Sequence, residues 1–173
     1  MHQRESNRRG ESETALVCID GRHYPAFKGD TMIADSGCSC HLVRNGECLE
    51  ELQDIKESIS GIGEGQMLAT KKGKMRCAFR GANGSTVYQT LSPVKVAQGL
   101  QEDLFSITAE ISNGGILSSD ERLNIVLEYK GGQNIVFDCR CKTRDGWIAG
   151  IQVLPCSGEV AKLSSDGVVK HSK

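Results

Sequence analysis

The segment Thr31-Met-Ile-Ala-Asp-Ser-Gly-Cys-Ser-Cys-His-Leu-Val43 carries the pattern that decides the fold. Its apolar start predicts a short strand, which ends in the turn-forming triplet Asp35-Ser36-Gly37. Extended chain resumes at His41–Val43. The triplet places a carboxylate where a strand breaks into a turn, and it occurs once in the 173 residues. A catalytic pair of such carboxylates would therefore need a second copy of the chain.

Length and charge restrict the class of protein. A chain of 173 residues suits one domain with a small addition. The 21 basic and 22 acidic residues leave a formal charge of −1, which argues against nucleic-acid binding. No apolar run reaches the length of about 18 residues that a membrane span needs. Because residues 1–14 are polar, we expect a disordered leader on an intracellular protein, with neither nucleic acid nor membrane as a partner.

The alternation of short apolar segments with turns predicts an all-β fold. Short apolar segments alternate with turns rich in glycine, of which there are 20 against 3 prolines. Asn83-Gly84 is a strong hairpin signal between Met75–Arg80 and Thr86–Leu91. Further strands are expected over residues 14–19, 32–35, 41–43, 94–96, 104–107, 116–117, 123–129, 134–139 and 147–154.

Two short helical stretches and one turn complete the expected elements. Three apolar residues repeat at helical spacing over Cys48–Ile55, so one or two helical turns are predicted there. Thr108–Ile111 predicts a short helix, which Asn113-Gly114-Gly115 stops. Lys71–Gly73 is expected to turn the chain before the strand that begins at residue 75.

Eight cysteines are many for this length, so metal binding and disulfides both have to be considered. Two pairs have the spacing Cys-x-Cys, namely Cys38/Cys40 and Cys139/Cys141, and His41 adjoins the first pair. Structural zinc more often uses a wider spacing, because a single spacer strains the chelate. Without a secretory signal, a disulfide framework is not expected. We expect reduced, mostly buried thiols, no metal and no cofactor, with a zinc-binding module as the weaker alternative.

A glycine-rich segment, Gly61-Ile62-Gly63-Glu64-Gly65, begins 26 residues after Asp35. Alternating glycines predict a loose hairpin tip, which can also be read as an ordinary hairpin loop. Asp103-Leu104-Phe105-Ser106-Ile107 follows as an apolar strand with a small polar residue inside it, before the expected short helix. The acid turn, the glycine-rich tip and the apolar strand therefore come in a definite order.

In that order, the motifs resemble those of retroviral-type aspartic proteases, and specifically the protease-like β-barrel region of copia-type retrotransposon polyproteins. Asp35–Leu42 is similar to the family's acid turn, small residues, histidine and hydrophobic residue. Gly61–Gly65 matches its Gly-hydrophobic-Gly-x-Gly segment, and Gln98–Ile107 matches the segment that ends in hydrophobic-Ser-hydrophobic. The resemblance covers roughly residues 28–112.

The resemblance implies a division of the chain into four parts. The predicted parts are a leader at 1–14, a retropepsin-like β-barrel with one short helix at 15–112, a β-rich hairpin extension toward the pre-integrase region at 113–156, and a loose tail at 157–173.

The resemblance also implies a homodimeric aspartic endopeptidase that cleaves a Gag-Pol polyprotein in the cytoplasm, the nucleus or virus-like particles. Asp35 of each subunit would supply one carboxylate, Ser36 would brace the pair, and Gly37 would allow close approach. Ser36 can equally be read as a residue that only caps the turn. The implied substrate flap consists of Gly61, Ile62, Gly63, Glu64 and Gly65, and the implied substrate-pocket strand holds Leu104 and Phe105.

Some positions depart from the family pattern without removing a catalytic atom. Met32 stands where the family has Trp, Gln98 where Pro is common and Asp103 where Asn is common. His41 is expected to be a packed or hydrogen-bonded strand residue, and Trp147 a core or interface anchor. The alternative function is a catalytically inactive, transposon-derived β-barrel fragment that serves only as a structural or interaction module.

Overall fold

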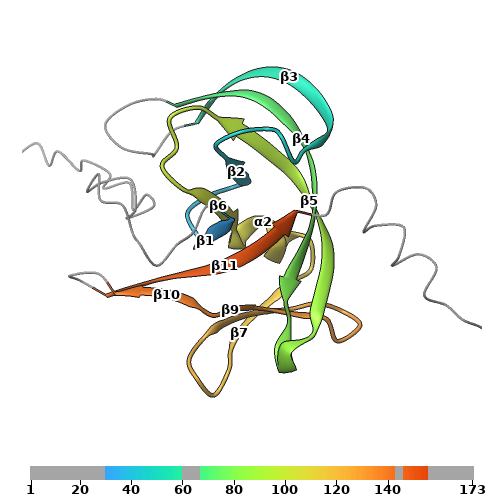
Figure 1. Ribbon diagram of the computed structural model, residues 1–173, viewed down its shortest axis with the longest axis vertical. Coiled ribbons are helices and arrows are strands. Elements are labelled where there is room, and N and C mark those ends of the chain that lie inside the picture. The colour runs from blue at the N-terminus through green and yellow to red at the C-terminus, as the bar shows by residue number, and fades with distance from the viewer. Residues whose placement is uncertain (1–29, 60–66, 143–145, 156–173) are drawn as a thin grey trace, which may run out of the picture.

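The structure is a computed structural model, and it describes residues 30–59, 67–142 and 146–155. Figure 1 shows the strands and the one short helix of these residues. The strands are Thr31–Asp35 (β1), His41–Val43 (β2), Glu50–Ile59 (β3), Met67–Arg80 (β4), Thr86–Ala97 (β5), Asp103–Ser106 (β6), Ile116–Ser119 (β7), Ile125–Glu128 (β8), Asn134–Phe137 (β9), Cys139–Lys142 (β10) and Trp147–Pro155 (β11). A 3-10 turn, η1, spans Ala82–Gly84, and the helix α2 spans Ile107–Ser112. The predicted all-β fold with one short helix is confirmed.

The larger sheet closes on itself as a barrel. Its eight strands follow the order β10-β11-β1-β6-β2-β5-β4-β3, and β11 also pairs with β4. One part of β11 pairs antiparallel with β1, with Ile33 opposite Gly150, and a later part pairs with β4, with Phe79 opposite Val153. β11 therefore joins two strands that stand far apart in the strand order and closes the strands from β11 to β4 into a ring, with β10 and β3 at the ends of the order.

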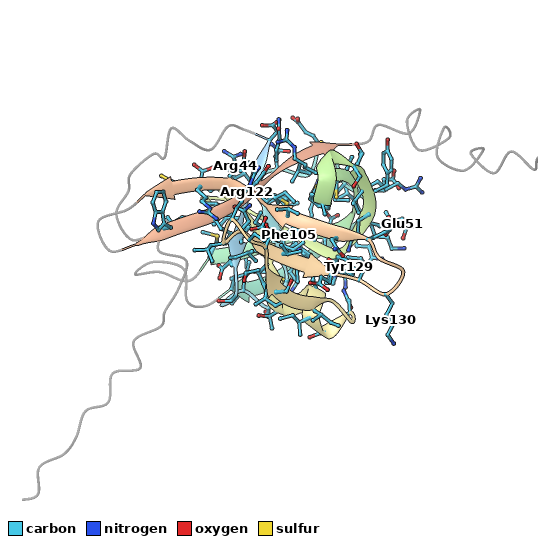
Figure 2. The ribbon with its side chains drawn as sticks, turned by 90° about the horizontal axis from the view of Figure 1, so that it is seen from below. Arg44, Glu51, Phe105, Arg122, Tyr129 and Lys130 are labelled. Carbon is cyan, nitrogen blue, oxygen red and sulfur yellow. The ribbon has the colours of Figure 1, made fainter. Side chains whose placement is uncertain are left out.

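A second sheet of three strands, β7-β8-β9, packs on the same core as the barrel. Leu127 of β8 and Phe137 of β9 are fully buried in one cluster with Phe105 of β6. The Phe105 ring meets the rings of Phe137 and Phe79 edge to face, with centroids 5.1 and 5.7 Å apart. Figure 2 shows Phe105 among packed side chains, whereas Lys130 points away from the molecule. One continuous core thus supports both sheets.

Strand pairing and packing cross the boundary predicted at residue 112. β11 belongs to the predicted extension at 113–156, yet it pairs with β1 and β4 of the barrel. Phe137, from the same extension, lies in the buried cluster with barrel residues. The extension shares the sheet and the core of the barrel, and the division of the chain into domains stays a prediction.

The helical turns predicted over Cys48–Ile55 are wrong, because most of this segment belongs to β3. Leu52 is 45% exposed, so the apolar residues at helical spacing do not face one buried surface. A register irregularity lies between Glu50 and Gln53, where Glu51 has a φ of 54°. The ladder with the long strand β4 outweighs the local spacing, since strand formation depends on the partner that is available.

The turn predicted at Lys71–Gly73 is also wrong, because these residues lie inside β4. The strand stays continuous there through two irregularities in its register with β5. The hairpin at Asn83-Gly84 is confirmed, with Gly84 at a φ of 74°, and the helix predicted at Thr108–Ile111 is confirmed as α2. The strand predicted at 14–19, the glycine-rich tip at 61–65 and the tail at 157–173 lie outside the described residues.

Candidate functional site

Asp35 ends β1 at the point where the chain turns, as the sequence predicts. Parallel pairing of β1 with β6 sets Asp35 opposite Ser106. The Oδ1 oxygen of Asp35 accepts a hydrogen bond of 2.7 Å from the N–H of Gly37. Asp35 is 9% exposed, whereas Ser36 and Gly37 lie at the surface. The Asp35 carboxylate is therefore held by a hydrogen bond within its own turn, and the tip of that turn, Ser36-Gly37, is exposed to solvent.

The acid loop, which we define as Asp35–Cys40, is held by the junction of β6 and α2. The Thr108 hydroxyl donates a hydrogen bond of 2.6 Å to the carbonyl of Ser36. The Ser106 hydroxyl donates to the carbonyl of Cys38 and accepts a bond of 3.0 Å from the N–H of Ala109, which caps α2. The start of the short helix and the acid loop thus form one hydrogen-bonded unit.

His41 lies directly behind this unit and is fully buried. Its Nδ1 accepts a hydrogen bond of 3.1 Å from the backbone N–H of Ser106. Its Nε2 lies 3.2 Å from Oε1 of Glu110. Because a backbone N–H can only donate, the ring proton must be on Nε2, where it points at the carboxylate. The expectation of a packed, hydrogen-bonded strand histidine is confirmed.

Glu110 of α2 is a buried carboxylate, and both of its oxygens accept hydrogen bonds. Besides His41, Gln89 donates to Oε2 at 2.6 Å and the Tyr129 hydroxyl donates to the same oxygen at 2.5 Å. Burial raises the pKa of Glu110, but the hydrogen bonds from His41 and Tyr129 outweigh it, so the pKa lies below its ordinary value. Burial, followed by the bond to Glu110, raises the pKa of Tyr129. Glu110 is therefore the ionised centre of a buried polar network.

Two thiols belong to the acid loop itself. The Sγ of Cys38 donates to the carbonyl of Cys40 at 2.8 Å. A hydrogen bond from the Cys38 thiol, aided by the charge of Lys95, lowers the pKa of Cys40 to about 7. Cys139 and Cys141 pack against the buried hydrophobic cluster that includes Cys40. Within the described ranges, no group of three or more His, Cys, Asp or Glu side chains is arranged to hold a metal ion.

The other residues singled out by the sequence have clear positions. Leu104 and Phe105 are 1% and 0% exposed, so the single chain uses them for packing, and their contact with a peptide stays a prediction. Trp147 is 64% exposed, so the predicted core role is wrong and an interface role stays a prediction. Asp103, which stands where the resembled family commonly has Asn, accepts hydrogen bonds from the backbone N–H and the Nε of Arg44. The flap residues fall outside the described part of the chain.

Several residues at the site were not identified from the sequence. A serine directly before a short helix is a recognisable N-cap, and this signal could have identified Ser106. Thr108 follows it within the first turn of α2. Glu110 and Tyr129 carried no sequence signal, because their meeting depends on how the second sheet packs against the barrel. A lone acid in a six-residue helix reads as an exposed residue until that packing is known.

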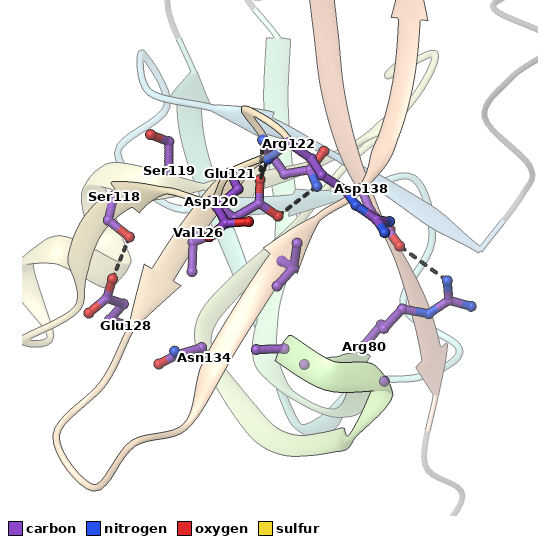
Figure 3. Close-up of a pocket in the computed structure, with 15 residues that line it drawn as sticks. Arg80, Ser118, Ser119, Asp120, Glu121, Arg122, Val126, Glu128, Asn134 and Asp138 are labelled. Atoms are coloured by element: carbon purple, nitrogen blue, oxygen red, sulfur yellow. Dashed lines mark hydrogen bonds and ion pairs between the residues drawn. The ribbon is translucent and has the colours of Figure 1, made fainter.

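An open concavity of about 770 Å³ lies elsewhere, between the second sheet and the tip of the β4–β5 hairpin. Figure 3 shows its polar lining, with the Arg80–Asp138 ion pair at 3.1 Å and the Ser118–Glu128 hydrogen bond. The Asp120 carboxylate accepts hydrogen bonds from Arg122 and Asn124 of its own loop. No residue of the acid loop lines this concavity.

Comparison with known proteins gives one match. Residues 32–115 match the family described as Pol polyprotein, beta-barrel domain, a range that includes the acid loop, β6 and α2. Over these residues the chain is therefore similar to the beta-barrel domain of Pol polyproteins. The comparisons with curated proteins and with solved structures gave no match. Among the described residues, no helix is long and apolar enough to cross a membrane.

Proposed function

We propose that the chain is the aspartic endopeptidase domain of a copia-type retrotransposon and that it acts as a homodimer. The observation that carries this proposal is the geometry of Asp35. Its carboxylate sits at a strand end, is fixed by the Gly37 N–H at 2.7 Å, and adjoins an exposed turn tip. The Pol-type family match over residues 32–115 supports the same assignment.

The proposed reaction uses two Asp35 carboxylates, one from each subunit, that share a proton across a two-fold axis. Two carboxylates about 3 Å apart cannot both ionise, so one stays protonated while the other is charged. The charged carboxylate activates a water, and the protonated one donates a hydrogen bond to the scissile carbonyl. Ser36 and Gly37, which are exposed in the single chain, would meet their counterparts at the axis.

The proposed substrate is an extended segment of a polyprotein. An extended peptide offers a repeating row of backbone donors and acceptors, which a strand-built cleft between two barrels can pair. The segment 61–65 would cover the bound peptide and exclude water from the dyad. No cofactor takes part in this chemistry.

The test is cleavage of a peptide library at acid pH by the full chain, compared with the variant Asp35→Asn. The variant keeps the shape of the carboxyl group but cannot supply the charged oxygen, so cleavage should cease. Glu121→Gln is a matched control, because it makes the same carboxylate-to-amide change at an exposed acid that lines the concavity and is not part of the acid loop. Equal cleavage by Asp35→Asn and the parent would contradict the proposal.

Subunit mixing tests the shared dyad directly. If each dimer needs both Asp35 side chains, an equal mixture of parent and Asp35→Asn chains leaves about a quarter of the dimers intact after random exchange. Activity per parent chain should therefore fall by about half, whereas a mixture with the active control Glu121→Gln should keep the activity per total chain that the parent has alone. A chain that stays monomeric and cleaves nothing would instead favour the alternative, an inactive β-barrel module derived from a Pol polyprotein.

A further inference from the structure

Ser106 is the link between the acid loop and the buried polar network. Its hydroxyl donates to the carbonyl of Cys38, and its backbone N–H donates to Nδ1 of His41 at 3.1 Å. Thr108, on the first turn of the same helix, holds the carbonyl of Ser36 at 2.6 Å. Whatever fixes Ser106 therefore fixes the loop that carries Asp35.

His41 can hold Ser106 in only one protonation state and ring orientation. Nδ1 must offer its lone pair to the Ser106 N–H, so the proton belongs on Nε2. A proton on Nδ1 would set two N–H groups against each other. The Oε1 oxygen of Glu110, 3.2 Å from Nε2, accepts that proton's hydrogen bond and thereby selects the required tautomer.

Glu110 is a firm anchor because it is itself immobilised. The residue is 1% exposed, and its second oxygen accepts hydrogen bonds from Gln89 at 2.6 Å and from Tyr129 at 2.5 Å. These donors come from β5 and from the residue after β8, so the anchor ties the barrel to the second sheet. On the other side, the His41 ring packs edge-on against Phe105 with centroids 4.8 Å apart.

We propose that His41, held in its Nε2–H form by Glu110, is a positioning residue that sets the acid loop and with it the Asp35 carboxylate. This inference rests on the proposed function. Both side chains are buried, so neither can touch a substrate, and they act on catalysis only through Ser106. The competing view is that the network merely stabilises the core.

Two substitutions at the same buried position separate the two views. The Oδ1 of Asn occupies the place of the histidine Nδ1, so His41→Asn keeps an acceptor for the Ser106 N–H and loses the donor to Glu110. The Nε2 of Gln occupies the place of the histidine Nε2, so His41→Gln keeps the donor and loses the acceptor. Both remove volume from the core, and His41→Asn removes more than His41→Gln, so both melting temperatures should fall and a purely structural role would make His41→Asn the more damaging variant.

The readouts are amide exchange of Gly37, followed by NMR, and the steady-state constants for peptide cleavage. His41→Gln should speed Gly37 exchange at least 10-fold and lower kcat by up to about 100-fold with little change in KM, because misplaced reacting groups lose rate rather than affinity. His41→Asn should stay within about threefold of the parent in both readouts. Equal effects of the two variants would overturn the inference.

Val87→Ala is the control for a purely structural effect. Val87 is 5% exposed in the core and takes no part in the hydrogen bonds around Glu110. The substitution should lower the melting temperature while leaving Gly37 exchange and kcat near the parent values. Loop opening in Val87→Ala as large as in His41→Gln would count against a directed link through His41.

A measurement on the unaltered chain needs no variant to fold. The nitrogen chemical shifts of the His41 ring should show an unprotonated Nδ1 and a protonated Nε2, and a proton on Nδ1 would overturn the inference. The exchange and ring measurements do not use cleavage. Loss of loop order in His41→Gln, in a chain with no peptidase activity, would therefore defeat the proposed function and leave the positioning role standing.

Discussion

At the scale of the residue, Cys40 shows how neighbours set the chemistry of one side chain. It is nearly buried, a setting that normally keeps a thiol protonated and inert. The hydrogen bond from the Cys38 thiol and the charge of Lys95 nevertheless favour its thiolate. Lys95 is itself fixed by an ion pair with Glu57 at 2.7 Å. The acid loop therefore contains a thiol with a pKa near neutral pH, five residues after Asp35.

The titration of Cys40 can be measured through its alkylation. The thiolate is the reactive form, so the rate of reaction with iodoacetamide should rise with pH around a midpoint of about 7. Lys95→Met and Cys38→Ala should each move the midpoint upward, toward the value of about 8.5 for a free thiol. Mass spectrometry of the alkylated peptide gives the rate at each pH.

The control for this experiment is Lys130→Met, since Figure 2 shows Lys130 pointing away from the molecule. It removes a positive charge without touching the acid loop, and the midpoint should stay where it is. An unchanged midpoint in both Lys95→Met and Cys38→Ala would contradict the assigned cause.

At the scale of the element, the sequence predicts strands well where their partners are near in the chain. Asn83-Gly84 identifies the β4–β5 hairpin because the turn chemistry and both strands lie within one window. The helix prediction at 48–55 fails because the conformation of this segment depends on its pairing with β4. The sequence does not show how long β4 is, because Lys71–Gly73 has the pattern of a turn although it lies inside the strand. Asp35, within a strong local pattern, is found from sequence, whereas Glu110 is not, since its donors come from three separate elements.

The contact between β3 and β4 makes a steric prediction at Gly73. A Cβ added there would lie 2.7 Å from the carbonyl oxygen of Glu50, which is backbone and cannot rotate away. Gly73→Ala should therefore force the two strands apart and lower the free energy of unfolding by about 1–3 kcal/mol. Urea titration followed by circular dichroism measures the loss.

Gly146→Ala serves as the reference substitution. A Cβ there meets nothing within 4 Å, so the same change of residue should leave stability near that of the parent. A loss in Gly146→Ala equal to that in Gly73→Ala would show that the close approach of β3 and β4 is not the cause.

At the scale of the whole molecule, the barrel and the second sheet should unfold as one unit. Phe137 from β9 is fully buried against Phe105 from β6, so the aromatic cluster belongs to neither sheet alone. Phe137→Ala should lower the free energy of unfolding by about 3–5 kcal/mol while the transition stays single. Fluorescence and circular dichroism, followed together, test whether all probes change at the same denaturant concentration.

Trp147→Ala is the matched aromatic control, because Trp147 is 64% exposed. Its removal should change stability by less than about 0.5 kcal/mol. Two separated transitions in the parent or in Phe137→Ala would mean that the sheets are independent.

The closure of the barrel by β11 has a consequence for dissecting the chain. A fragment trimmed to the family match at 32–115 would keep Asp35, β6 and α2, but it would lack the strand that pairs with both β1 and β4. Two unpaired strand edges would then face solvent, and Glu110 would lose the Tyr129 hydroxyl. Such edges recruit other chains indiscriminately, so the trimmed fragment should precipitate rather than form an ordered pair. A fragment for expression should therefore extend through β11, well beyond the family match at 32–115.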